Sequence, residues 1–235
     1  MRTIGLIGGM SWQSTATYYR HLNSLVAARL GGLHSADLIV RSVDFAGLEA
    51  AMGRGDWQAI GVRLADEAAA LEQAGAGCVL LCTNSMHKVH DRIEAALKTA
   101  PFFHIADALG TVLRRDGIRR VGLLGTRFTM QESFYADRLR DGFSIATMTP
   151  TDSQIPVIDE IVFAELCRGI VRDESRQAYL DIIDDLKGRG AEAIVLGCTE
   201  IEMLVKPEHH DLPLYDTTLI HARHAVDWSL EGSGH

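Results

Sequence analysis

The sequence has no block of lysine and arginine, and its 235 residues carry a formal net charge of −8 at pH 7. Nucleic acids and anionic membranes are bound through clustered positive charge, so this composition argues against both kinds of partner. No apolar run approaches the roughly 20 residues of a membrane-spanning helix, and the first ten residues show no signal-peptide cleavage pattern. These absences indicate a soluble globular protein, with the last five residues, EGSGH, expected to lie outside the fold.

Cysteine is scarce and occurs only as Cys78, Cys82, Cys167 and Cys198. The spacing of the four residues gives neither a disulfide framework nor the two close pairs of a zinc site. Unpaired cysteines suit a reducing compartment, so we expect a cytoplasmic protein.

Cofactor signatures are missing as well. The glycines of residues 3–9, TIGLIGG, lack the full spacing of a dinucleotide-binding loop, and no lysine stands in a recognisable setting for pyridoxal phosphate. Two histidine pairs have a spacing of three residues, but no third ligand accompanies either pair. We therefore expect neither a cofactor nor a metal ion, and we assign the paired histidines to surface or capping positions: His87, His90, His221 and His224.

What the sequence does contain is an alternation of apolar strands and amphipathic helices. Residues 3–9, 36–44, 78–82 and 101–107 have the pattern of strands, and helical spacing fills the intervals between them. Strands that alternate with helices form a parallel sheet covered on both faces. The first hundred residues therefore predict an α/β layer structure.

The same plan is then repeated. RRVGLLGT (119–126) matches RTIGLIGG (2–9), and GAEAIVLGCTE, which begins at Gly190, matches GAGCVLLCTNS, which begins at Gly75. We interpret this as a duplication that gives two pseudo-symmetric α/β domains, each with a four-stranded parallel sheet flanked by helices. The expected boundaries are 1–106 plus 209–235 for the first domain and 107–208 for the second.

The third strand of each half ends in a polar corner. The first corner is Thr83-Asn84-Ser85, and the second corner is Cys198-Thr199-Glu200. Ligands on parallel sheets bind beyond the carboxyl ends of the strands, so we expect an active site in the cleft between the domains. Helix starts at such corners bind carboxylates and favour a thiolate, which predicts a lowered pKa for Cys198.

Two acid/base groups on opposite faces of a carbon atom can invert a stereocentre by removing a proton from one face and returning it to the other. The segments GLIGGMSW, LCTNSMHK, IADA, VGLLGT and LGCTE together resemble the aspartate/glutamate racemase family over nearly the whole chain. The resemblance implies cofactor-independent racemisation between two such domains, and commonly a homodimer. Glu200 stands where glutamate racemases of cell-wall synthesis typically carry histidine, which favours the aspartate branch.

The family's first corner usually reads Cys-Asn-Thr, so the resemblance places Thr83 at the catalytic position opposite Cys198. The repeat gives the same register. Adjacent side chains at a strand end point to opposite faces, so we expect Cys82 to face a helix layer unless a bulge turns it inward. By resemblance Cys198 acts on the L-enantiomer. Because a hydroxyl is a poor base, Thr83 should be the weak partner and the enzyme biased toward L-substrates.

The loops after the first strands and the two corners should hold the substrate, an amino acid that we expect to be aspartate or glutamate. Family members tend to place polar or basic contacts near positions 52 and 168, and Met52 departs from that pattern. The predicted binding residues are Met10, Ser11, Met52, Asn84, Ser85, Thr126, Arg168 and Thr199.

Two alternatives remain at this point. Hydantoin racemases, maleate isomerases and arylmalonate decarboxylases share the fold and use the same corners on other carboxylates. The loss of one thiol at position 83 also fits a non-catalytic protein that binds amino acids.

Overall fold

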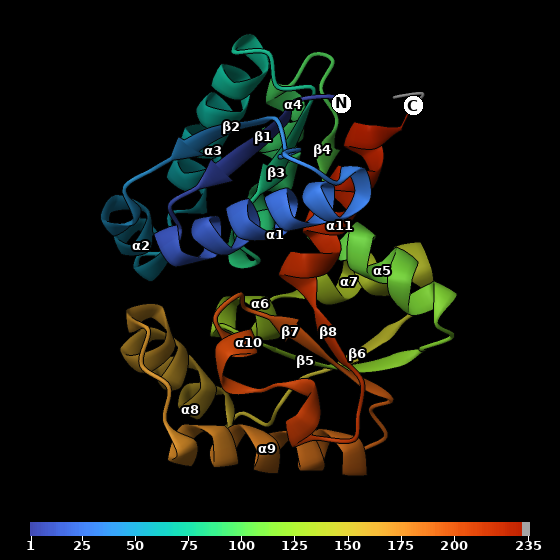
Figure 1. Cartoon of the computed structure of the whole chain (residues 1–235). Coiled ribbons are helices and arrows are strands. Elements are labelled where there is room, and N and C mark those ends of the chain that lie inside the picture. Colours follow the sequence, from blue (N-terminus) through green and yellow to red (C-terminus); the bar gives the residue numbers. More distant parts are fainter. Residues whose placement is uncertain (232–235) are drawn as a thin grey trace. The chain divides into compact units, whose positions relative to one another are not determined.

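The computed structural model describes residues 1–231, and residues 232–235, the last part of the expected tail, lie outside the described residues. The chain divides into two compact units (Figure 1). The first unit contains Met1–His104 and the chain from His221 onward, and the second contains Ile105–Ile220. Within residues 1–231, no helix combines the length and the apolarity needed to cross a membrane.

The first unit is built on a four-stranded sheet in the order β2-β1-β3-β4, in which every pairing is parallel. Its strands are β1 (Ile4–Gly8), β2 (Leu38–Ser42), β3 (Cys78–Leu81) and β4 (Phe102–Phe103). The two central strands are buried along their whole length, as the apolar runs IGLIG and CVLL predict.

Helices cover both faces of this sheet. Ile4, Leu6 and Leu80 point into a core shared with α1 (Trp12–Leu30) and α11 (Thr217–Leu230). On the opposite face, Gly5 lies against Leu71 of α3 (Trp57–Gln73). The remaining helical segments are α2 (Phe45–Gly53), the short turn η1 (Ser85–Val89) and α4 (His90–Ala96).

The second unit repeats this sheet in the order β6-β5-β7-β8, again with every pairing parallel. Its strands are β5 (Arg120–Gly125), β6 (Ala146–Met148), β7 (Ala193–Gly197) and β8 (Leu214–Asp216). Each unit thus places its own second strand at one edge and its third strand beside the first. The predicted pair of four-stranded parallel sheets is confirmed.

Two separate cores flank the second sheet. Val121 and Val195 face α5 (Ile105–Arg115) and α7 (Ser133–Phe143). Leu124 and Leu196 face the other core, with α9 (Asp173–Gly188). That core is completed by α6 (Arg127–Gln131), α8 (Ile155–Glu160), η2 (Ile161–Glu165), η3 (Leu166–Arg168) and α10 (Ile201–Leu204), and η4 (Pro207–His209) follows before β8.

The structure differs from the expected domain boundaries, mainly at the second crossing. We expected 209–235 to return to the first domain, but Leu214–Asp216 form β8 and pair with β7 of the second unit. The chain returns only at His221, inside α11. The first crossing lies at 104/105 instead of 106/107. Backbone pairing decides these boundaries, because a strand belongs to the sheet that satisfies its N–H and C=O groups.

Candidate active site

The parallel sheets bring the ends of neighbouring strands to one edge of each unit. In the first unit Ile7 of β1 pairs with Leu81 of β3, so the loop after β1 lies beside the first corner. In the second unit Gly125 of β5 pairs with Gly197 of β7, so Thr126 lies beside the second corner. The carboxyl edges of the two sheets therefore carry the polar residues singled out from the sequence.

The first corner turns the chain from β3 into η1. Thr83 is half-buried, whereas Asn84 and Ser85 are buried. The Thr83 carbonyl accepts a hydrogen bond of 2.8 Å from Nδ1 of His87, and the Asn84 carbonyl accepts one of 3.1 Å from the His87 backbone N–H. His87, in the helical turn that follows the corner, thus holds the backbone of the corner through two hydrogen bonds.

Cys82 lies in the packed layer behind this corner. It is fully buried in the core cluster that contains Tyr18 and Leu22 of α1, and burial raises the pKa of its thiol far above the ordinary value. Its backbone N–H donates to the Ile7 carbonyl and its carbonyl accepts from the Ser14 hydroxyl at 2.7 Å. Cys82 therefore faces the helix layer, as the strand alternation predicted.

The loop after β1 is shaped by a glycine. Gly9 has φ of +95°, and a Cβ there would lie 2.1 Å from the Val43 carbonyl oxygen, so only glycine fits. The Gly9 N–H donates to Oγ1 of Thr15 at 2.7 Å. Met10 is 4% exposed and the Ser11 hydroxyl caps α1. The Met10 side chain thus packs into the interior, and the Ser11 side chain begins α1.

The two side chains predicted to contact the distal part of a substrate differ in exposure. Met52 is 6% exposed on α2 and belongs to the packed interior of the first unit. Arg168 is exposed at the end of η3, just before Gly169 turns the chain with φ of +74°. Arg168 is therefore accessible to an anion, whereas Met52 offers only an apolar wall.

In the second corner, a thiol meets a buried carboxylate. The Cys198 thiol donates a hydrogen bond of 3.1 Å to Oε2 of Glu200, a residue that is only 5% exposed. The Thr199 hydroxyl donates to the same oxygen. Gly197 lets β7 approach β5 closely, since a Cβ there would lie 2.9 Å from the Leu124 carbonyl oxygen. Glu200 thus accepts hydrogen bonds from the side chains of both other residues of its corner.

This arrangement overturns the expected lowering of the Cys198 pKa. Burial raises the pKa of the thiol well above its ordinary value, and the negative charge of Glu200 and the nearby Cys167 raise it further. The Glu200 backbone N–H, which donates to the sulfur, acts in the opposite direction but is outweighed. Sequence reasoning weighed the helix start and missed the carboxylate two residues away, although the letters CTE contain it.

The wall around this thiol is formed by the second unit's own core. Cys167 and Cys198 both pack against the cluster that includes Tyr179. Burial and the nearby Glu200 raise the pKa of Cys167 to about 12, and burial raises the pKa of the Tyr179 hydroxyl well above its ordinary value. The surroundings of the thiol are therefore apolar or acidic, and the neutral thiol is the form they favour.

The structure also corrects the assignment of two histidines to the surface or to caps. His87 and His221 are fully buried, and His104, which the sequence did not single out, is 2% exposed beside them. The sequence signal available was the spacing. His87 follows Thr83 by four residues, a distance at which a side chain in the first helical turn can reach back to a carbonyl of the corner before it.

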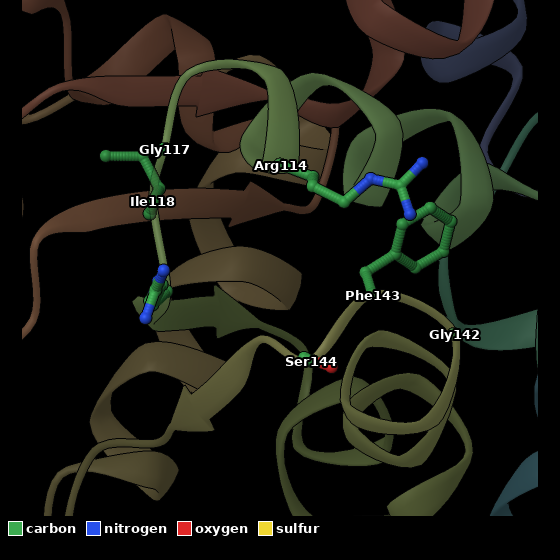
Figure 2. A pocket seen from close by; sticks show the side chains of 7 residues that line it. Arg114, Gly117, Ile118, Gly142, Phe143 and Ser144 are labelled. Carbon is green, nitrogen blue, oxygen red and sulfur yellow. The ribbon is translucent and has the colours of Figure 1, made fainter.

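A groove of about 480 Å³ lies in the second unit at the other end of β5 (Figure 2). It runs between the ends of α5 and α7, where Arg114 extends over the Phe143 ring at 5.7 Å. Its rim includes Gly117 and Ser144, which precede β5 and follow α7. The groove therefore lies at the amino edge of the sheet and is separate from the second corner.

Known proteins share the sequence pattern and the fold of this chain. The pattern of the Asp/Glu/hydantoin racemase family matches residues 7–225. A candidate Asp/Glu racemase from Yersinia pestis is 46% identical, with a TM-score of 0.92 over 98% of this chain and 100% of the other. An aspartate racemase homologue from Pyrococcus horikoshii OT3 is 28% identical, with a TM-score of 0.85 over 98% and 100%.

A glutamate racemase from Francisella tularensis subsp. tularensis SCHU S4, solved in complex with D-glutamate, shares the fold at 16% identity. Its TM-score is 0.72 over 99% of this chain and 82% of the other. With a family match over nearly its whole length and a paired-sheet fold common to these structures, this chain belongs to the Asp/Glu/hydantoin racemase family and is an isomerase.

Proposed function

We propose that the protein is a cofactor-independent amino-acid racemase that interconverts L- and D-aspartate or glutamate by removing and returning the α-proton. The observation that carries the proposal is the Cys198 thiol hydrogen-bonded to the buried Glu200 carboxylate at the carboxyl end of a central strand. A thiol with an adjacent proton acceptor is an activated acid/base pair.

In the proposed reaction, Glu200 accepts the Cys198 proton and the thiolate removes the α-proton of an L-amino acid. The electron pair of the broken C–H bond is delocalised into the substrate carboxylate, which the donors of the corners stabilise. A proton delivered to the opposite face completes the inversion, and Thr83, or a water molecule that it orients, is the group proposed there. The proposed donors to the substrate are Met10, Ser11, Asn84, Ser85, Thr126 and Thr199.

We further propose that the enzyme favours L-substrates. Thr83 has a hydroxyl whose pKa lies far above that of a thiol, so proton removal from the D-enantiomer should be slow. Cys82 cannot replace it, since its thiol is fully buried in the core between the sheet and α1.

Support for an acidic substrate comes from the relatives and from one cation. The Yersinia pestis protein is a candidate Asp/Glu racemase and the Pyrococcus horikoshii protein an aspartate racemase homologue. Arg168 is exposed and can bind the side-chain carboxylate of an acidic substrate, whereas the buried, apolar Met52 would tolerate a substrate with a neutral side chain. We also propose a cytoplasmic homodimer, as the family resemblance and the free cysteines suggest.

The test is a screen of L- and D-amino acids for α-proton exchange in heavy water, followed by proton NMR. We expect exchange of aspartate or glutamate, faster from the L-enantiomer, together with slow loss of optical rotation. Equal exchange rates from both enantiomers would refute the L-bias. Exchange confined to hydantoins or malonates would instead assign one of the related reactions.

A non-catalytic amino-acid-binding protein is the second candidate, favoured by the threonine at position 83 and by the raised pKa of Cys198. The Cys198→Ser variant separates the two. A racemase should lose exchange by at least about a thousandfold while it still binds L-aspartate in calorimetry. A binding protein would show the same affinity in both forms and no exchange in either.

A further inference from the structure

The first corner is supported by a buried imidazole. His87 is 0% exposed, and its Nδ1 lies 2.8 Å from the Thr83 carbonyl oxygen. A carbonyl can only accept, so Nδ1 must bear the proton of this hydrogen bond. In the neutral ring Nε2 then carries no proton, and the tautomer of His87 is fixed by the corner itself.

Three further imidazoles surround this ring. The ring centroid of His104 lies 4.5 Å from that of His87 and 4.8 Å from that of His90. The centroid of His221 lies 5.9 Å from that of His87. We refer to His87, His90, His104 and His221 as the histidine cluster. Its members come from η1, α4, the segment after β4, and α11, all within the first unit.

His221 has a hydrogen-bond partner at each ring nitrogen. Its Nε2 lies 2.8 Å from the Phe103 carbonyl, so this nitrogen donates. Its Nδ1 lies 2.8 Å from the Tyr18 hydroxyl oxygen. The two contacts fix the orientation of the His221 ring beside His87.

The surroundings of His87 disfavour a positive charge on its own ring. Tyr18 of α1 contacts His221 through its hydroxyl, and the exposed Asp91 carboxylate lies 2.9 Å from His90 on the outer side of the cluster. Burial, and then the proximity of His221 and His90, lower the pKa of His87 well below its ordinary value, against the opposing effect of its hydrogen bonds to Thr83 and Asn84.

We propose that His87 is a positioning residue for the first corner. The Nδ1–H of His87 sets the direction of the Thr83 carbonyl and, through it, the directions of the Thr83 hydroxyl and of the donors Asn84 and Ser85. The role of the corner in catalysis rests on the proposed function; its fastening by His87 does not.

The first test is nitrogen-15 NMR of histidine side chains in the wild-type protein, which requires no enzymatic activity. At pH 7 His87 should show a protonated Nδ1 and an unprotonated Nε2. The Nε2–H tautomer for His87 would overturn the proposal.

The second test uses matched variants. His87→Asn keeps an N–H donor near the position of Nδ1, whereas His87→Phe keeps the ring and removes the donor. For His87→Phe we expect a loss of kcat of about tenfold or more and a raised KM, because the donor to the Thr83 carbonyl is lost. His87→Asn should recover most of the activity, and His224→Asn, on the exposed side of α11, should behave as wild type.

Equal kcat and KM for wild type and His87→Phe would refute the positioning role. If His87→Phe does not fold, the comparison of wild type with His87→Asn and the NMR tautomer decide the question. If the wild type shows no exchange with any amino acid, the proposed function fails while the NMR result still stands.

Discussion

Cys198 donates its thiol proton to Glu200, with 3.1 Å between Sγ and Oε2. Burial, and then the Glu200 carboxylate that accepts this proton, stabilise the protonated thiol and raise the pKa of Cys198. The same contact provides the acceptor for that proton when a substrate arrives. In the proposed reaction Glu200 therefore holds the resting thiol neutral and also makes its deprotonation direct.

Glu200→Gln should change thiol reactivity and catalysis in opposite directions. Loss of the negative charge lowers the pKa of Cys198 toward its ordinary value, so alkylation by iodoacetamide at pH 8 should become faster. Loss of the proton acceptor should slow exchange from the L-substrate by about a hundredfold or more. Faster exchange in this variant would contradict the role of Glu200 as base, and Glu202→Gln on α10 is the matched control.

The rate of exchange should be independent of the raised Cys198 pKa if Glu200 takes the thiol proton directly. Because that pKa lies above the ordinary thiol value of about 8.5, solvent alone supplies little thiolate near neutrality. In the proposed reaction the proton moves within the Cys198–Glu200 pair, so we expect kcat/KM for the L-substrate to level off already at pH 7. A rise that continues above about pH 8.5 would show that the base is thiolate formed by the solvent, without Glu200.

Thr83→Cys should reduce the difference between the two enantiomers. A thiol at position 83 is a better base than the hydroxyl, so exchange from the D-substrate should rise by about tenfold or more while exchange from the L-substrate changes little. Thr83→Ala should lower proton return without improving removal from the D-face. Measured by NMR in heavy water, unchanged D-exchange in Thr83→Cys would remove position 83 from the catalytic pair.

Cys82→Ala should affect stability and not chemistry. The thiol is fully buried in the core, so its removal should lower the free energy of unfolding by about 1 kcal/mol through the cavity that it leaves. Urea denaturation measures this loss, and exchange per folded molecule should stay at the wild-type rate. Cys78→Ala, in the same cluster, is the matched control. A selective loss of exchange in Cys82→Ala would restore Cys82 as an active-site thiol.

Glu72 should contribute an acid-sensitive part of the stability of the first unit. Its carboxylate accepts backbone N–H groups from Lys98, Thr99 and Ala100, which lowers its pKa to about 2. A depressed carboxyl pKa stabilises the fold above the unfolded value of about 4.5 and loses that contribution as the pH falls toward 2.

Glu72→Gln should accordingly lower the melting temperature at pH 7 and flatten its decline below pH 4.5. The exposed Glu49→Gln on α2 serves as the control, with no expected change in slope. Identical acid limbs in wild type and Glu72→Gln would contradict the assignment.

Most of the fold was predictable because it depends on local pattern. The glycine-terminated apolar runs 3–9 and 119–126 form β1 and β5, and the register between Gly75 and Gly190 correctly predicted the third strand of each sheet. The orientation of Cys82 followed from the alternation of side chains along a strand. The return of the chain at His221 was not predictable, since it depends on β8 pairing with β7.

By itself, then, the sequence determined the two sheets, the corners at their carboxyl edges and the residue types that those corners carry. Only the tertiary structure decided the protonation chemistry. The pKa of Cys198 is raised because Glu200 and the surrounding core are brought against it, and His87 stays neutral because elements distant in sequence, from Tyr18 to His221, close around it. Spacing along a chain fixes periodicity and register, whereas burial and the distances between charges depend on how distant segments pack.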